Sequence, residues 1–140
     1  MLTVRLEPPS TLRPDEVLAL YEAVGWTAYT RDPDSLLRAV HGSHRVATAR
    51  DDGRRLVGLA RSVSDGETIV YVQDVLVEPD RHRHGIGSRL LTTFLEAYDG
   101  VRQQVLLTET EPGQRAFYES LGFTETHDMR PELRAFVRFR

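Results

Sequence analysis

Two glycines one residue apart, Gly85 and Gly87, stand at the start of a predicted helix, shortly after an apolar strand that ends at Val77. The first turn of a helix has unpaired amide groups and the positive end of the helix dipole. Glycine has no Cβ, so an anion can approach the backbone closely. Three arginines around this turn add cationic donors: Arg81, Arg83 and Arg89. The pattern therefore predicts a cradle for a diphosphate.

Other kinds of site fit this stretch poorly. A dinucleotide-binding loop needs a third glycine where this chain has Leu90, and a P-loop needs a lysine, which the chain lacks. There is no cysteine, which excludes a thiol nucleophile and cysteine-ligated zinc. His82 and His84 lie beside arginines that would repel a cation, so we favour phosphate contacts for them and expect no metal.

Two segments resemble the GNAT superfamily of N-acetyltransferases. The stretch from Val77 through Gly85-Ile86-Gly87-Ser88 to Leu91 is similar to the family's acyl-CoA motif. Downstream, Ala116-Phe117-Tyr118 followed by Gly122-Phe123 resembles a second family region. The resemblance covers roughly residues 45–126. It implies transfer of an acetyl group from acetyl-CoA to a primary amine by direct attack in a ternary complex.

The resemblance also implies roles for individual residues. The backbone of the strand would pair with the pantetheine arm, and the amides of the turn would hold the pyrophosphate. The residues implied in cofactor binding are Val75, Leu76, Val77, His82, Arg83, His84, Gly85, Ile86, Gly87 and Ser88. Two positions depart from the family pattern: His82 replaces a glutamine or arginine, and no asparagine stands near Glu111.

Catalytic roles are left with alternatives. Tyr118 matches the family's acid that protonates the departing thiolate, and it could also be a packing tyrosine beside Phe117. Asp74, in a buried strand, could anchor or activate the amine, or it could be a structural carboxylate. Glu109 is a further candidate base, with a solvated turn as its simpler interpretation.

An aromatic-rich loop precedes the second predicted helix. By family analogy Trp26, Thr27 and Tyr29 contact the acceptor, and the alternative is a loop packed on the core.

Hydrophobic periodicity supplies the elements that position these residues. Helices are expected over 14–24, 33–40, 85–98 and 114–121, and strands over 3–6, 45–50, 54–63, 68–77, 104–108 and 134–139. The strand at 68–77 is β-branched almost throughout, which predicts burial on both faces. The expected fold is α/β (α+β), with a mixed, mostly antiparallel sheet of six to seven strands, helices on both faces and splayed central strands, in one domain over 1–140.

The overall composition argues against two classes of partner, nucleic acids and membranes. A net charge of −3 argues against a nucleic-acid binder, and no apolar run is long enough to span a bilayer. We expect a cytoplasmic protein that acts on a small-molecule or peptide amine, with a homodimer possible by analogy. The alternatives are a non-catalytic acyl-CoA-binding or sensing module on the same fold and a nucleotide-binding domain of another class.

Overall fold

The computed structural model describes residues 1–82 and 84–140. The chain forms two compact units, Met1–Leu107 and Thr108–Arg140, and each is described here by itself. The expectation of one domain over the whole chain stays a prediction.

The first unit is built on a five-stranded sheet with the strand order β1-β2-β3-β4-β5. The strands are β1 (Thr3–Glu7), β2 (Val46–Arg50), β3 (Leu56–Ser64), β4 (Ile69–Val77) and β5 (Gln103–Leu106). Neighbouring strands are antiparallel, except that β4 and β5 are parallel because α4 connects them. The sheet therefore has five strands, and the predicted six to seven were too many.

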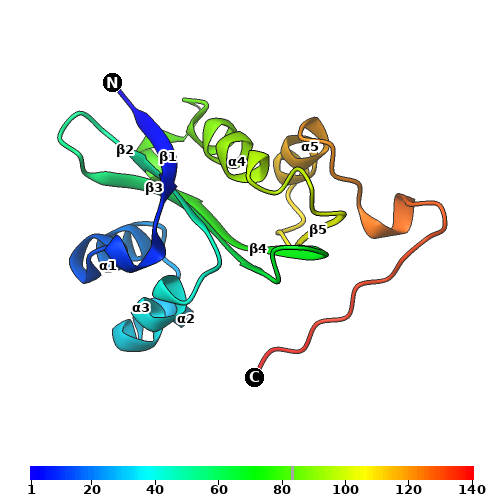
Figure 1. Cartoon of the computed structure of the whole chain (residues 1–140), viewed down its shortest axis with the longest axis horizontal. Helices are drawn as coiled ribbons and strands as arrows, with labels where there is room; N and C mark the ends of the chain where they lie inside the picture. The colour runs from blue at the N-terminus through cyan, green and yellow to red at the C-terminus, as the bar shows by residue number, and fades with distance from the viewer. Residues whose placement is uncertain (83) are drawn as a thin grey trace. The chain divides into compact units, whose positions relative to one another are not determined.

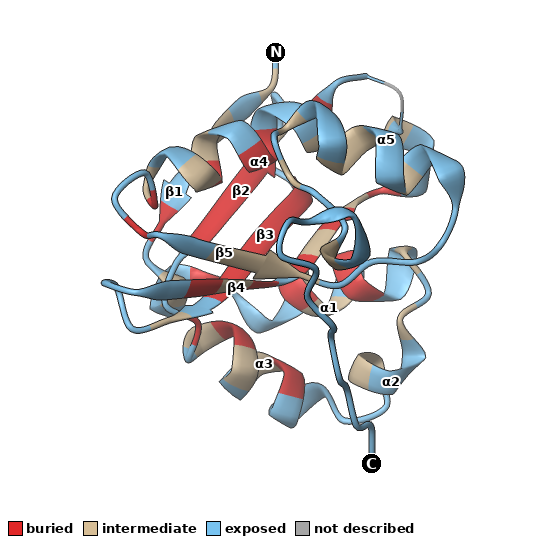
Figure 2. Cartoon of the chain, turned by 90° about the vertical axis from the view of Figure 1, so that its right-hand side faces the viewer, coloured by how far each residue is buried: buried red, intermediate tan, exposed pale blue. Residues whose placement is uncertain are grey.

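Helices cover both faces of this sheet. They are α1 (Pro14–Ala23), α2 (Thr27–Thr30), α3 (Pro33–His41) and α4 (Ile86–Glu96), with short 3-10 turns η1 (Pro9–Thr11) and η2 (Pro79–Arg81). α4 packs across β1 to β4 on one face, whereas α1 packs on the other face together with α2 and α3 (Figure 1). Buried residues concentrate on β2, β3 and the inner face of α4 (Figure 2).

Local signals set the helical boundaries. Val17, Leu20 and Tyr21 are buried, as the spacing of the α1 stripe predicts. The Asp32 carboxylate accepts a hydrogen bond from the Ser35 amide at 3.1 Å and so caps α3. The segment predicted as a loop after Gly25 is instead the single-turn helix α2.

β4 departs from its predicted burial and changes its pairing halfway along. Its residues alternate between buried and more exposed positions, so it is not buried on both faces. Asp74 lies opposite Arg61 of β3, and Val72 lies opposite Ser62, so Gln73 is an extra residue at a β-bulge. The pairing of β4 with β5 ends at Val72. β5 itself is half-buried to exposed.

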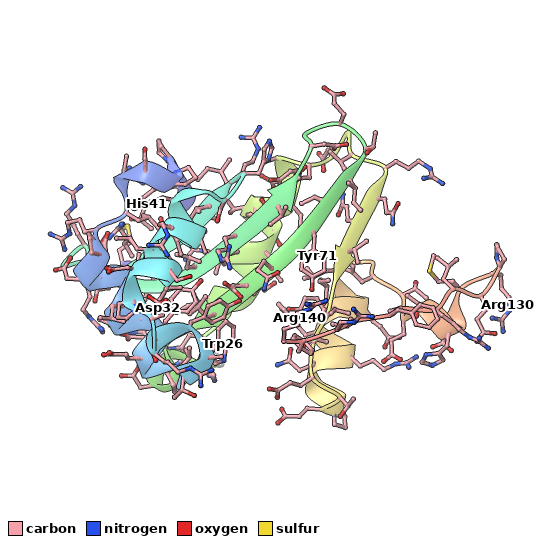
Figure 3. All side chains as sticks on the ribbon, turned by 90° about the horizontal axis from the view of Figure 1, so that it is seen from below. Trp26, Asp32, His41, Tyr71, Arg130 and Arg140 are labelled. Carbon is pink, nitrogen blue, oxygen red and sulfur yellow. The ribbon has the colours of Figure 1, made fainter. Side chains whose placement is uncertain are left out.

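The second unit contains α5 (Pro112–Ser120) and the 3-10 turn η3 (Thr126–Asp128). Arg115 joins them, because its guanidinium lies 2.7 Å from Asp128 and 3.3 Å from Glu125. The predicted strand over 134–139 is absent, although all of these residues are described. The second unit contains no strand with which residues 134–139 could form hydrogen bonds. Phe136 and Phe139 are 88% and 89% exposed. Arg130 and Arg140 mark the two ends of this extended segment (Figure 3).

Candidate active site

The turn into α4 has the features of an anion cradle. Gly85 is the N-cap of α4 with a left-handed φ of 72°, and no side chain caps the helix. Apart from its neighbours in the chain, a Cβ at this position would meet no atom of the described residues within 4 Å, so these residues leave the space above the helix start open. Ile86 is buried, whereas Gly87 is half-buried and His84 and Ser88 are exposed. The first-turn amides therefore lack an intrahelical partner at an open surface.

The strand that leads to this turn has a free side. Since the ladder between β4 and β5 ends at Val72, residues 73–77 of β4 have no partner in β5. Residues 74–77 keep their pairing with β3 on the other side, where Val77 lies opposite Gly58. α4 packs over Gly58, because a Cβ there would lie 3.6 Å from Ile86 Cγ2, an ordinary van der Waals contact. The open backbone of Val75, Leu76 and Val77 thus runs directly toward the start of α4.

Side chains of the loop between β4 and α4 bind to the protein's own backbone and carboxylates. His82 Nε2 lies 2.9 Å from the Val77 carbonyl oxygen, which can only accept, so this nitrogen donates to the carbonyl and is not available to a phosphate. Arg81 pairs with Asp51 of the β2–β3 turn at 3.2 Å. Arg55 forms a two-pronged ion pair with Glu78.

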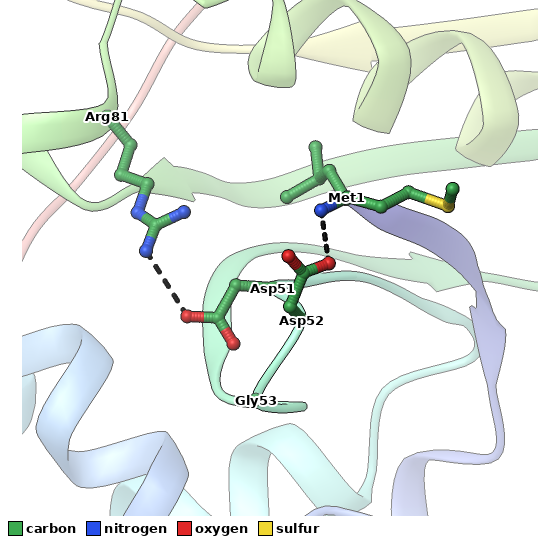
Figure 4. A pocket seen from close by; sticks show the side chains of 6 residues that line it. Met1, Asp51, Asp52, Gly53 and Arg81 are labelled. Carbon is green, nitrogen blue, oxygen red and sulfur yellow. Dashed lines mark hydrogen bonds and ion pairs between the residues drawn. The ribbon is translucent and has the colours of Figure 1, made fainter.

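The predicted cationic donors are therefore partly committed elsewhere. Arg81 lines a surface pocket with Met1, Leu2, Asp51, Asp52 and Gly53 (Figure 4). In that pocket the Met1 amino group pairs with Asp52. Arg89 reaches the Leu2 carbonyl oxygen at 3.4 Å. Arg83 lies outside the described residues.

Asp74 is buried and fully engaged. Its Oδ2 accepts hydrogen bonds from the Tyr21 hydroxyl, at 2.8 Å, and from Arg61 Nε, while its Oδ1 accepts from the Tyr29 hydroxyl at 2.8 Å. Asp74 and Arg61 are only 3% and 5% exposed. Of the two interpretations of Asp74, these contacts favour the structural carboxylate. The amine-activating role stays a prediction.

Sequence reasoning missed Arg61 and Tyr21 as partners of Asp74. Tyr21 was recognised only as part of the apolar stripe of α1. Arg61 interrupts an apolar strand, which was the one available signal, because a buried charge needs a partner. Burial and the nearby Asp74 charge both raise the pKa of the Tyr21 hydroxyl.

The predicted acceptor residues lie on α2 or, for Trp26, directly before it, next to this cluster. The Tyr29 hydroxyl also accepts a hydrogen bond from Gln73 Nε2 at 2.9 Å. The Trp26 and Tyr29 rings are 6.1 Å apart, and both pack against the core. Trp26 precedes α2 and Asp32 follows it in the helical layer (Figure 3), while Thr27 is exposed. Burial raises the pKa of Tyr29, and the Asp74 charge adds to the rise.

Tyr118 belongs to the second unit. Its ring makes edge contacts with Phe117 and Phe123, with centroids 5.0 and 6.0 Å apart. Burial raises the pKa of its hydroxyl, so the group is protonated at neutral pH. Glu109 and Glu111 are exposed. The ring contacts of Tyr118 fit the packing interpretation. The raised pKa keeps its hydroxyl protonated, as the acid role also requires.

Two further kinds of feature are absent from the described part of the chain. No group of three or more potential ligand side chains could hold a metal ion there. Over the same residues, no helix combines the length and apolar character that crossing a bilayer requires.

Comparisons with known proteins agree with this geometry. A GNAT acetyltransferase structure from Streptococcus pneumoniae is 33% identical, with a TM-score of 0.83, over 100% of this chain and 98% of that one. An aminoglycoside N-acetyltransferase solved in complex with CoA is 18% identical and shares the fold, with a TM-score of 0.69 over 100% of this chain and 95% of its own. Among curated proteins, the uncharacterized N-acetyltransferase ycf52 of Porphyra purpurea is 30% identical over 117 residues, which are 81% of this chain.

The chain spans 66% of the length of that algal relative. The model of the GNAT acetyltransferase domain matches residues 42–125, which include the bulge of β4, the start of α4 and Tyr118. The chain therefore belongs to the GNAT acetyltransferase family.

Proposed function

We propose that the protein transfers the acetyl group of acetyl-CoA to a primary amine by direct attack in a ternary complex. The observation that supports this most is the free side of β4 over residues 73–77, which leads to the open, uncapped start of α4. Amide groups of the pantetheine arm can pair with the backbone of Val75 to Val77, as an added strand does. The first-turn amides of α4 can hold the pyrophosphate.

The chemistry then needs two contributions from the chain, a proton for the leaving group and contacts to the acceptor. The amine nitrogen attacks the thioester carbonyl, the C–N bond forms, and the C–S bond breaks. Tyr118 gives its proton to the departing thiolate, while the amine loses its proton to solvent. Trp26, Thr27 and Tyr29 contact the acceptor. The fold is shared with aminoglycoside acetyltransferases, which favours a small-molecule amine as the acceptor.

Acetyl-CoA turnover with a panel of amines tests this proposal. The panel contains an aminoglycoside, a polyamine, an amino acid amide and a short peptide, and free thiol is the product measured. We expect thiol release that depends on one of these amines. Binding of acetyl-CoA without release in the presence of any amine supports the non-catalytic module instead. Tighter binding of NAD or ATP than of CoA contradicts the cradle itself.

A matched pair of glycine variants tests the cradle directly. Gly85→Ala places a methyl group in the open space above α4, at a residue with a φ of 72°. Gly66→Ala creates similar backbone strain, because Gly66 has a φ of 80°, but its Cβ would only touch His44 at 3.4 Å. We expect Gly85→Ala to weaken CoA binding at least tenfold and Gly66→Ala to leave it unchanged. Equal affinities in the two variants would contradict the proposed cradle.

A further inference from the structure

A buried polar cluster underlies the acceptor residues, and it consists of Arg61, Asp74, Tyr21 and the hydroxyl of Tyr29. The cluster joins four elements, because its members come from β3, β4, α1 and α2. Arg61 Nη1 also reaches Ser43 Oγ and the Ala39 carbonyl oxygen, each at 3.4 Å. Among the described residues, no buried side-chain nitrogen or oxygen lacks a partner. The cluster is thus complete within the first unit.

Stability alone does not account for an ion pair at this depth. Removing two charges from water costs several kcal/mol, and apolar side chains of similar size often stabilise a core equally well or better. The two charges here are 3% and 5% exposed, so the desolvation is nearly complete. A cluster of this kind is better explained by the geometry that it imposes on its neighbours.

The cluster fixes the geometry of β4 just after Val72, where its pairing with β5 ends. Asp74 follows the bulge residue Gln73, which has no partner in β3. The Tyr29 hydroxyl bridges the two residues, because it donates to Asp74 Oδ1 at 2.8 Å and accepts from Gln73 Nε2 at 2.9 Å. Gln73 is exposed and Tyr29 is half-buried, so the bridge lies at the surface end of the cluster.

We infer that Arg61 and Tyr21 are positioning residues, which act through Asp74 to fix the Tyr29 hydroxyl as the group that binds the amine of the acceptor. The Tyr29 proton is committed to Asp74, and one oxygen lone pair is committed to Gln73. The second lone pair is free to accept an N–H bond from the amine. Because Arg61 balances the charge of Asp74, this carboxylate can stay ionised in the core and orient the hydroxyl. The inference rests on the proposed function.

An all-apolar replacement separates positioning from stability. The triple variant Tyr21→Phe/Arg61→Met/Asp74→Leu removes Asp74, which accepts the Tyr29 proton, and the two groups that hold Asp74, while filling similar space. We expect its melting temperature to stay close to that of the wild type and its CoA affinity to change less than twofold. The acceptor KM should rise about 5- to 10-fold, the loss of one hydrogen bond. An unchanged acceptor KM in the folded variant overturns the inference.

A cycle with Tyr29→Phe shows whether the cluster acts through Tyr29. The single variant should raise the acceptor KM to a similar extent, and adding the triple replacement should raise it no further. Additive effects overturn the inference. If the triple variant does not fold, Tyr21→Phe replaces it in the same cycle with an expected rise of about threefold. Glu7→Gln serves as the control, because it alters another buried ion cluster of the sheet that does not touch Tyr29.

A second measurement keeps the test independent of any acceptor. In the wild type, the Tyr29 hydroxyl proton should exchange slowly enough to be observed by NMR, and in the triple variant it should be lost. Equal exchange in the two proteins overturns the positioning inference. If the wild-type protein releases no thiol with any amine while this proton difference is present, the acetyltransferase proposal fails and the positioning of Tyr29 stands.

Discussion

Removing Arg50 should cost the fold a predictable amount of stability. Its guanidinium forms two-pronged ion pairs with Glu7 of β1, at 2.8 and 3.1 Å, and with Glu16 of α1, at 2.9 and 3.0 Å. The three side chains are 15%, 7% and 10% exposed. In Arg50→Met both carboxylates keep their burial and lose their main cation. This cluster ties α1, which carries Tyr21, to the sheet.

The expected magnitude follows from the burial. Breaking a buried ion pair costs about 3–5 kcal/mol, and the partial exposure of Arg50 places this case at the lower end, about 3 kcal/mol. The remaining contacts of Glu7 with Thr48, at 3.0 Å, and with Arg5, at 3.3 Å, limit the loss further. For a chain of this length, about 3 kcal/mol corresponds to a fall of about 10 °C in melting temperature.

The pH dependence gives the sign of the effect. Hydrogen bonds from Arg50 lower the pKa of Glu7 and of Glu16 below the usual 4.5. Wild-type stability from these groups is therefore fully present above pH 4.5 and is lost as the pH falls through the lower folded values. Without Arg50, burial raises the pKa of both carboxyl groups. At low pH the variant therefore protonates them and no longer carries two unpaired buried charges. The difference between the two proteins should shrink from pH 7 to pH 4.

Urea titration followed by Trp26 fluorescence measures this difference, because Trp26 is the only tryptophan and packs 5.9 Å from the Tyr21 ring. Arg102→Met is the control, since Arg102 is exposed. A loss below about 1 kcal/mol at pH 7 in Arg50→Met, within the range of ordinary surface changes, would refute the reasoning. A gap that stays constant down to pH 4 would refute it as well.

Two further changes have definite outcomes. Tyr118→Phe should lower kcat by about 10²- to 10⁴-fold while the CoA affinity measured by calorimetry changes little, because only proton transfer is removed; unchanged turnover would take Tyr118 out of the mechanism. Since burial raises the pKa of Tyr118 above its usual 10.0, this group should cause no loss of activity below pH 10. Gly58→Val should cost about 1–3 kcal/mol in urea titration and also weaken CoA binding, because a Cβ there already lies 3.2 Å from Ala49 and 3.6 Å from Ile86 at the start of α4. Wild-type CoA affinity in this variant would show that α4 does not depend on that close approach.

The sequence carried enough information for the helix start at Gly85 and for most of the elements around it. The two glycines after a buried strand and the 3.6-residue stripe of the following helix are local features, and local features depend little on the rest of the fold. The strand at 134–139 was predicted from the same kind of pattern and did not form. Alternation shows that a segment can pair, whereas a ladder also needs a neighbouring strand.

In the candidate site too, local features could be predicted from the sequence and contacts between distant residues could not. The pairing of Asp74 with Tyr21 and Tyr29 joins residues that are 53 and 45 positions apart, and no spacing rule connects them. The bulge at Gln73 depends on the register between two strands, which the sequence leaves open.

The sequence alone determined which chemical groups are present: a helix start with two glycines, no lysine or cysteine, and a tyrosine in a family motif that could act as an acid. Tertiary packing decided which of these groups are free to act. It gave Asp74 three hydrogen-bonding partners, directed His82 to a carbonyl oxygen and Arg81 to Asp51, and left one side of β4 without a strand. The physical reason is that backbone conformation is set largely by near neighbours, whereas the partner of a buried charge is set by whichever element is packed against it.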